Sequence, residues 1–447
     1  MSDLRHFGLF NAKVPRFTSY PPANWFTEGI SADHVRTWQS NAPKDAEISL
    51  YVHIPFCRRL CWFCACRTQG TRNAAPLAPY VDRVLREAAD QRRGFINGVT
   101  PKRLHLGGGT PTILSASLLD RLLRGLDDIW GLSDLDEFSV EVDPTDVGPA
   151  RLAMLKQQGL SRASLGIQDF DRQVQAAIGR TQSRDLTQSV VDDLRSLGVS
   201  SLNFDLLYGL PFQTPGTLAA TLEAALAMQP GRIALFGYAH VPWMSKRQSL
   251  IPADALPKPE ARLALFEQAR KTLLGQGYVQ IGIDHFARPE DALAHAFFDQ
   301  RLKRSFQGYT DDAIGYLVGL GASAISTFPQ GFAQNIPVTG KYATQIDAGV
   351  SAIWRGYALS EADRLKSNLV EQLMCYYVAT LSDAQAAKPL IVKAMNQIAQ
   401  DFDGAVTWDG RTLEIRRWAH PLVRLIAVQL VTPSTPLTAE RTYSAAI

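Results

Sequence analysis

The middle of the chain alternates between short apolar runs and longer amphipathic stretches. Six short runs predict strands at Ile48–Ile54, Arg103–Leu106, Phe138–Asp143, Arg162–Ile167, Leu202–Leu207 and Ile233–Tyr238. Apolar residues recur at helical spacing over Tyr80–Phe95, Leu118–Leu126, Leu186–Leu197 and Leu218–Met228. Strands that alternate with helices predict parallel pairing with helical crossovers, and hence an α/β barrel or a doubly wound sheet.

The pattern changes toward both ends of the chain. Residues 1–45 are rich in proline and irregular, and they predict an arm rather than a domain. Ser360 and Asp363 fit a capping box, and apolar runs follow over Leu369–Ala379 and Leu390–Ile398. Asp409-Gly410 stands between alternating residues and predicts a hairpin turn. We therefore expect an arm (1–45), an α/β body (46–358) and a mainly helical domain with a small β wing (359–447).

Composition narrows the class of protein. A hydrophobic content of 46% supports a large core, and a formal net charge of +3 implies no nucleic-acid partner. No stretch approaches about 18 consecutive apolar residues, so we expect no membrane span. The first residues lack the apolar segment of a signal peptide, and the thiols then predict a cytoplasmic location.

Four of the five cysteines lie close together, at positions Cys57, Cys61, Cys64 and Cys66. Short runs of cysteines spaced by two or three residues are typical of iron–sulfur clusters, and three ligands for four irons would leave one iron open. A disulfide framework is disfavoured in a long chain without an export signal. A zinc site normally joins two separated pairs of ligands, which this chain lacks, and a closed four-cysteine cluster that includes Cys66 stays open as an alternative.

Several longer stretches accompany the cysteines. They are Pro15–Pro21 (PRFTSYP), Tyr51–Cys57 (YVHIPFC), Gly107–Thr112 (GGGTPT), Glu141–Pro144 (EVDP), Asp205–Pro211 (DLLYGLP), Asp284–Pro289 (DHFARP) and Phe306–Thr310 (FQGYT). With these stretches the chain resembles the oxygen-independent coproporphyrinogen III oxidases, a family of radical S-adenosylmethionine (radical SAM) enzymes. The resemblance implies a partial (β/α)6 TIM-like barrel. It assigns Cys57, Cys61 and Cys64 as ligands of a 4Fe–4S cluster, with SAM at the remaining iron, and leaves Cys66 without a defined role.

The resemblance also implies the reaction. A 5′-deoxyadenosyl radical made from SAM would oxidatively decarboxylate two propionates of coproporphyrinogen III to vinyl groups, giving protoporphyrinogen IX in haem biosynthesis. The reduced cluster would take its electron from a donor such as flavodoxin or ferredoxin, and we expect the protein to be a monomer. No side chain is assigned as an acid or base, because the radical made from SAM would carry out the reaction.

Some residues suggest binding roles by themselves, and the resemblance extends them. Glycines after a strand let backbone N–H groups approach a ligand, so Gly107–Thr110 could form a nest for a carboxylate. Glu141 and Asp205 are carboxylates inside apolar strands and need partners. By resemblance, one SAM contacts Tyr51, Gly108, Glu141 and Ile325. A second SAM beside it would contact Phe63, Gly109, Thr110, Gln168, Arg180, Asp205 and Ala239.

The implied substrate carries four carboxylates, which call for arginine. The candidates are Arg16 in the arm and Arg288 in the DHFARP stretch. Aromatic residues of the arm could cover the opening as a lid: Phe17, Tyr20, Trp25 and Phe26.

Two relatives with a similar barrel remain alternatives, a haem-binding chaperone and a radical SAM methyltransferase. The N-terminal arm and the DHFARP stretch favour the oxidase. Phe17 and Ile283 depart conservatively from the residues common in that family, so a paralogue with another substrate also stays open.

Overall fold

The largest sheet of the computed structural model, which describes residues 2–431 and 443–446, holds the six predicted strands side by side. All neighbouring pairs among them are parallel. The strands are β1 (Ala46–Ile54), β4 (Val99–Gly108), β5 (Glu137–Val142), β6 (Arg162–Gln168), β7 (Ser201–Tyr208) and β8 (Arg232–Gly237). The prediction of a partial (β/α)6 barrel is confirmed.

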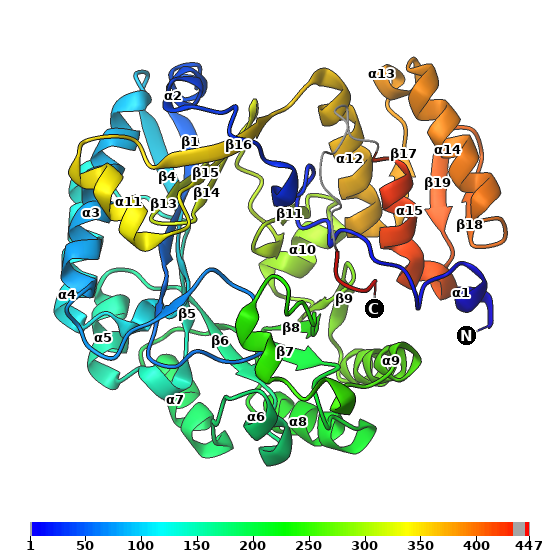
Figure 1. Ribbon diagram of the computed structural model, residues 1–447, viewed down its shortest axis with the longest axis horizontal. Helices are drawn as coiled ribbons and strands as arrows, with labels where there is room; N and C mark the ends of the chain where they lie inside the picture. The colour runs from blue at the N-terminus through cyan, green and yellow to red at the C-terminus, as the bar shows by residue number, and fades with distance from the viewer. Residues whose placement is uncertain (1, 432–442, 447) are drawn as a thin grey trace.

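Helices follow each of these strands (Figure 1), and they include the four that the amphipathic pattern predicts. They are α3 (Leu77–Gly94), α4 (Ala116–Trp130), α5 (Pro149–Gln157), α6 (Arg172–Ala177), α7 (Arg184–Ser196), α8 (Pro215–Ala227) and α9 (Pro259–Gly275). Within the described part of the chain, no helix combines the length and the apolar character needed to cross a membrane.

The sheet continues beyond the barrel strands on both sides, which the sequence did not predict. It has 12 strands in the order β16-β15-β14-β13-β1-β4-β5-β6-β7-β8-β10-β9. β13 is parallel to β1, and the other added strands pair antiparallel. The added strands are β9 (Val279–Ile281), β10 (His285–Ala287), β13 (Leu317–Leu320), β14 (Ile325–Phe328), β15 (Gly331–Asn335) and β16 (Ile353–Ala358). The barrel is therefore open, and its two outer strands are covered by further pairing rather than left as free edges.

The two faces of the barrel strands differ in chemistry. In β1, Leu50, Val52 and Ile54 are buried in the core between the sheet and the helices. Side chains alternate along a strand, so Tyr51 and His53 point to the opposite, inner face. Polar residues of the neighbouring strands share that inner face, and this alternation brings the functional candidates together.

The C-terminal part is mainly helical, with a three-stranded sheet of order β17-β19-β18 (Figure 1). The capping box at Ser360 is present, but the apolar run beyond it is not all helix, because Tyr377 adopts φ 61° and the next residues form β17. The predicted hairpin joins β18 and β19. Residues 432–442 and 447 of the expected domain lie outside the described residues. The elements are α12 (Glu361–Tyr376), β17 (Val378–Thr380), α13 (Asp383–Ala386), α14 (Pro389–Asp401), β18 (Val406–Trp408), β19 (Thr412–Ile415), a 3-10 helix (Arg417–Leu422) and α15 (Val423–Gln429).

The N-terminal arm is an integral part of the packing. It contains α1 (Ser2–His6) and α2 (Ala32–Ser40), and Figure 1 shows it running from the C-terminal domain to the far side of the barrel. Phe17, Tyr20 and Trp25 are buried in one core with residues of α12, α14 and α15. Phe26 stacks on Phe332 of β15, with ring centroids 5.6 Å apart. These rings are fixed core residues, so the expectation of an aromatic lid is not supported.

Smaller elements complete the structure. The Cys loop carries β2 (Phe56–Cys57) and β3 (Gln69–Gly70), and the segment after β10 carries α10 (Ala292–Phe298), β11 (Lys303–Ser305) and β12 (Gly308–Thr310). Helix α11 (Thr339–Asp347) follows β15.

Candidate active site

The clustered cysteines lie on a loop that leaves the C-terminal end of β1. The loop is closed by parallel pairing of β2 with β3, and Cys57 is the last residue of β2. Cys61 is buried, Cys57 and Cys64 are half-buried, and Cys66 is exposed. The three thiols that sequence reasoning selected as ligands are therefore less exposed than the fourth.

The cysteines lie close enough together to shift one another's pKa. Burial raises the pKa of Cys57 to about 11, and the charges of Cys64 and Cys61 act in the same direction. A hydrogen bond from Cys66 lowers the pKa of Cys64 in spite of its burial. Cysteine side chains gathered in this way are the donor set of an iron–sulfur cluster, which binds them as thiolates.

The spacing of the thiols fits a cluster better than a single ion. Four sulfurs bound to one zinc at about 2.3 Å would lie within roughly 4 Å of one another. Among the described residues, no group of three Cys, His, Asp or Glu side chains is close enough to hold one metal ion. A cluster of several irons spreads its ligands more widely, so Cys57, Cys61 and Cys64 suit a 4Fe–4S centre.

The glycines at the end of β4 make room for the Cys loop. A Cβ on Gly109 would lie 2.7 Å from the carbonyl oxygen of Phe56 and 3.0 Å from Cys57 Sγ. The amide of Gly109 donates to Ile54 O at 2.8 Å, and the amide of Thr110 donates to Phe56 O at 2.9 Å. The expected nest of free amides is therefore absent here, because these donors hold the loop itself.

A chain of polar side chains crosses the inner face beside the loop. Glu141 accepts a hydrogen bond from the Gly108 amide at 3.0 Å, and its Oε1 lies 3.5 Å from His105 Nε2. Burial acts to raise the pKa of Glu141, but His105 and the Gly108 amide outweigh it and lower the pKa. Tyr51 stacks on His105, and its hydroxyl lies 2.9 Å from His53 Nδ1. An ionised Glu141 at this position can accept hydrogen bonds from a ligand amine or hydroxyl.

A second carboxylate lies further round the barrel. Asp205 accepts hydrogen bonds from Ser164 Oγ at 3.0 Å and from Asn203 Nδ2 at 2.9 Å. Burial, and then the negative charge of Glu141, raise the pKa of Asp205 to about 6. Gln168 ends β6 with φ +72° at a break in register against β7, which turns its side chain out of the ladder. The two predicted residues thus lie on neighbouring strands, Gln168 at the end of β6 and Asp205 within β7 beside the residue that pairs with Gln168.

Arg180 joins the Cys loop to the strand ends. Its Nη1 lies 3.5 Å from Cys61 Sγ and 3.1 Å from Asp143 Oδ2, and its Nη2 donates to Gly166 O at 2.7 Å. Burial acts to lower the pKa of Arg180, but the charge of Asp143 outweighs it and the pKa is raised. Arg180 is therefore a fixed cation at the sulfurs rather than a surface charge.

Sequence reasoning missed the residues that hold the loop from the β8 side. Gln248 is fully buried, and its Nε2 donates to Phe63 O at 2.7 Å and to Ala239 O at 3.1 Å. Ser245 Oγ donates to Cys64 O at 3.0 Å. Two predicted SAM contacts, Phe63 and Ala239, are thus bridged by a side chain that belongs to no recognised motif.

Ile325 opens β14 on the other side of the site. Its backbone crowds Gly319 of β13, which pairs in register with Tyr51. The structure therefore brings Ile325 near Tyr51, as expected for one binding site.

A cavity of about 1690 Å³ adjoins the Cys loop. Cys64, Ala65 and Cys66 line one part of it, and the ends of β7 and β8, α9, the arm and the C-terminal domain line the rest. Ligand pockets usually measure about 300–1,000 Å³, so this cavity has room for a macrocycle. Seven arginines and three carboxylates are among its lining residues, an excess of four positive charges.

The two predicted substrate arginines have different locations. Arg16 stands in the cavity, where its Nη2 donates to Gly237 O at 2.9 Å. Arg288 is not a lining residue, and its amide donates to Gly231 O, just before β8 begins. Because β10 runs antiparallel to β8, the chain reaches Arg288 at the end of the barrel opposite the Cys loop. Arg288 is therefore not kept as a substrate candidate.

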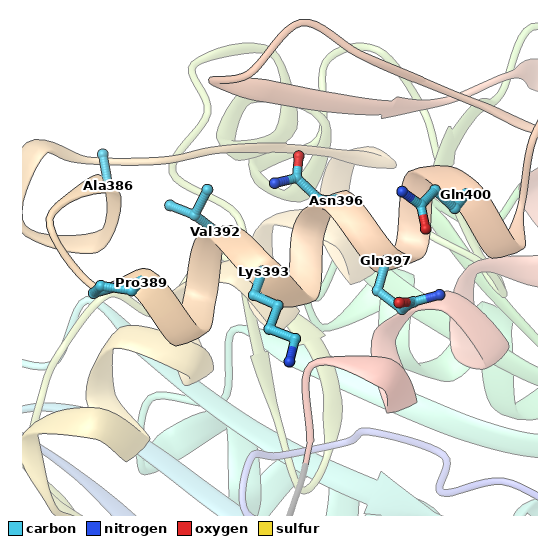
Figure 2. Close-up of a pocket in the computed structure, with 7 residues that line it drawn as sticks. All are labelled: Ala386, Pro389, Val392, Lys393, Asn396, Gln397 and Gln400. Atoms are coloured by element: carbon cyan, nitrogen blue, oxygen red, sulfur yellow. The ribbon is translucent and has the colours of Figure 1, made fainter.

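A second hollow, of about 560 Å³, lies along α14 (Figure 2). Figure 2 shows that most of its side chains project from that one helix, among them Lys393, Asn396 and Gln397. None of its lining residues is shared with the large cavity, and it holds no cysteine or carboxylate. The chemistry of the site is therefore confined to the large cavity and the inner face of the barrel.

Known proteins agree with this geometry. A family model for the radical SAM superfamily matches residues 51–225. The oxygen-independent coproporphyrinogen III oxidase of Paracoccus denitrificans is 47% identical over 430 residues, which cover 95% of each chain. The enzyme of the same name from Escherichia coli is 35% identical, over 95% of this chain and 94% of that one. A solved structure of coproporphyrinogen III oxidase from Escherichia coli, described as a radical SAM enzyme, superposes with a TM-score of 0.86 at 33% identity, over 94% of this chain and 99% of that one. The resemblance inferred from the motifs is confirmed, and the chain belongs to the family of oxygen-independent coproporphyrinogen III oxidases, which are radical SAM enzymes.

Proposed function

We propose that this protein oxidatively decarboxylates two propionates of coproporphyrinogen III to vinyl groups and so forms protoporphyrinogen IX. The observation that carries the proposal is the arginine-lined cavity that reaches Cys64 and Cys66. A flexible tetrapyrrole with four carboxylates matches both the volume and the charge of this cavity. The relatives that match over nearly the whole chain carry the name of this activity.

The cofactor residues follow from the site. Cys57, Cys61 and Cys64 would hold a 4Fe–4S cluster, and the cluster with SAM supplies a carbon radical that abstracts hydrogen. Glu141, Gly108, Tyr51 and Ile325 would hold and orient the SAM bound at the cluster.

A second SAM would lie beside the first, toward β6–β8. Gln168 at the end of β6 and Asp205 within β7 lie on neighbouring strands there, and Arg180 and Phe63 connect this region to the Cys loop. A carboxylate suits ribose hydroxyls and an arginine suits a carboxylate, which supports this assignment. The remaining residues of the proposed second site are Gly109, Thr110 and Ala239.

The test is an anaerobic assay of the reconstituted protein with coproporphyrinogen III, SAM and a reductant. Release of CO2 in step with SAM cleavage and vinyl formation is the expected result. Tight haem binding without CO2 release would favour the haem chaperone. Transfer of a methyl group from SAM would favour the methyltransferase.

We further infer that an acidic electron carrier, of the flavodoxin or ferredoxin kind, docks over the Cys loop. Residues 57–72 and 243–250 contain no Asp or Glu. They present a basic and apolar surface formed by Arg58, Arg59, Arg67, Arg72, Lys246, Trp243 and Met244, all exposed. Arg58 meets only Asp146, at 3.9 Å. Complementary charge raises the rate of such encounters.

Charge reversal at Arg59 and Lys246 tests whether the electron carrier docks at this surface. The double variant Arg59→Glu, Lys246→Glu should slow cluster reduction by reduced flavodoxin at low salt, while reduction by dithionite stays unchanged. Arg301→Glu, an exposed change outside the Cys loop, is the matched control. Equal reduction rates in all variants would reject this docking surface.

Location and assembly are also part of the proposal. The described cysteines are all free thiols, which supports a cytoplasmic protein. We propose that it acts as a monomer, because one chain contributes every residue of the site. Sedimentation of the cluster-loaded protein tests this.

A further inference from the structure

Four arginines from four separate parts of the chain meet in the large cavity. They are Arg16 of the arm, Arg262 of α9, Arg304 of β11 and Arg424 of α15. Arg16 has a large exposed area because it stands in the cavity, yet protein surrounds it. Burial first, and then the charge of Arg16, lower the pKa of Arg262 and Arg424. Arg16 thus lies close enough to each of the other three cations for their charges to repel.

The protein orients these cations without neutralising them. Arg16 donates to Gly237 O, Arg262 to Tyr238 O at 2.7 Å and Arg304 to Phe17 O at 2.6 Å, all neutral carbonyls. Buried Nε of Arg262 and Nη1 of Arg304 have no hydrogen-bond partner in the described structure. The guanidinium of Arg424 makes no hydrogen bond or ion pair with any described residue.

Two of the three carboxylates that line the cavity have other partners, and the charge of Asp284 offsets only part of the charge of the arginines. Asp284, whose charge reaches Arg16, Arg304 and Arg424, lies 2.8 Å from His285 Nδ1. Glu267 pairs with Arg270 at 2.9 Å. A buried charge without a partner is costly, so such an arrangement is suited to an anionic ligand.

We propose that Arg16, Arg262, Arg304 and Arg424 bind the carboxylates of the tetrapyrrole and make affinity depend on how many carboxylates it carries. This rests on the proposed function. In each round the 5′-deoxyadenosyl radical takes one hydrogen atom from a propionate, a one-electron acceptor takes one electron, and neutral CO2 leaves, so that a vinyl group remains. Each round therefore removes one negative charge from the ligand. The tetracarboxylate substrate binds tightest, the tricarboxylate intermediate is retained, and the dicarboxylate product is released.

Arg424 is the best residue with which to test whether affinity depends on the number of carboxylates. It belongs to the C-terminal part of the chain, and its guanidinium makes no hydrogen bond or ion pair with a described residue, so its substitution breaks no such bond within the described protein. Arg424→Gln removes the charge and Arg424→Lys keeps it. Arg93→Gln on the exposed surface of α3 is the matched control, because Arg93 pairs only with Asp90 in its own helix.

The experiment measures binding without turnover. The cluster-loaded protein, with no SAM added, is titrated anaerobically with the unreactive oxidised porphyrins that carry four, three and two carboxylates. We expect affinity to fall roughly tenfold or more for each carboxylate lost, as for one charge-assisted hydrogen bond. The loss should shrink at high salt.

The variants separate charge recognition from general binding. Arg424→Gln should weaken the tetracarboxylate about tenfold and the dicarboxylate much less, while Arg424→Lys and Arg93→Gln stay near the parent protein. If Arg424→Gln proves unstable, Arg16→Gln serves as the second variant. Equal affinity of the parent protein for all three porphyrins, or an equal effect of Arg424→Gln on all three, would overturn the inference. CO2 release with flat affinities rejects this inference alone, whereas no CO2 release rejects the proposed function.

Discussion

Arg180 Nη1 lies 3.5 Å from the sulfur of Cys61, so the segment between α6 and α7 touches the Cys loop directly. The same guanidinium pairs with Asp143 at 3.1 Å, and both side chains are mostly buried. One residue thus connects a thiol of the loop to the end of β5.

Removing this cation should destabilise the protein. Arg180→Gln leaves Asp143 buried without its partner, and breaking a buried pair costs about 3–5 kcal/mol. Urea unfolding of the cluster-free protein measures the change. The double variant Arg180→Gln, Asp143→Asn should recover part of the loss, because it leaves no buried charge. If single and double variants are equally unstable, the ion pair is not the cause.

The cysteine variants test the ligand set. Cys57→Ala, Cys61→Ala and Cys64→Ala should each lose the cluster, measured as bound iron and sulfide after reconstitution. Cys66→Ala should keep most of it, since the exposed Cys66 is not needed as a ligand. Cys375→Ala is the control, because Cys375 is a fully buried cysteine away from the loop. Cluster loss in all four loop variants would instead support a closed four-cysteine site.

Gly109 should tolerate no side chain. The Cβ of Gly109→Ala would meet the Phe56 carbonyl at 2.7 Å, so the Cys loop must shift and cluster content should fall. Gly340→Ala is the matched control, since a Cβ there meets nothing within 4 Å and the residue lies in α11. In that helix alanine should be neutral or stabilising, by up to about 1 kcal/mol. A Gly109→Ala protein with full cluster content would show that the loop can yield.

Asp205 should make stability depend on pH. Its pKa is raised to about 6 from an ordinary value of 3.8, so the folded state holds the proton more strongly than the unfolded state. Stability should therefore decline as pH rises from about 4 to 6, by at most about 3 kcal/mol, and stay lower above that window. Asp205→Asn should remove this part of the decline. Unfolding of the ligand-free parent and variant at pH 4, 5, 6 and 7 tests it, and parallel pH curves would contradict it.

Local pattern was sufficient for the six barrel strands and for four of their helices, because apolar runs and amphipathic runs alternate there along the chain. It was insufficient for β13–β16, which have four to six residues each. β13 finds its partner in β1, more than 260 residues earlier, and no local signal records that pairing. The aromatic residues of the arm were likewise recognisable, but their burial against α12 and α15 depends on tertiary packing.

The candidate site could likewise be predicted only in part, where local sequence pattern was informative. Residues at the ends of parallel strands could be grouped in advance, since those ends meet at one edge of the sheet. Arg288 was misplaced because β10 reverses direction, which the sequence motif does not reveal. Gln248 and Arg424 carry no motif, and they reach the site only through long-range folding.

The buried arm also has a consequence for biosynthesis. Phe17 leaves the ribosome more than 350 residues before Leu373 and Ile426, the core residues with which it clusters. At roughly 5–20 residues per second, these residues are synthesised about 20–80 s after Phe17. During that time the N-terminal arm, which is made first, exposes apolar side chains whose packing partners have not yet been synthesised. We expect a nascent chain halted before α12 to expose this segment to chaperones and proteases, and completion of the last helices to withdraw it.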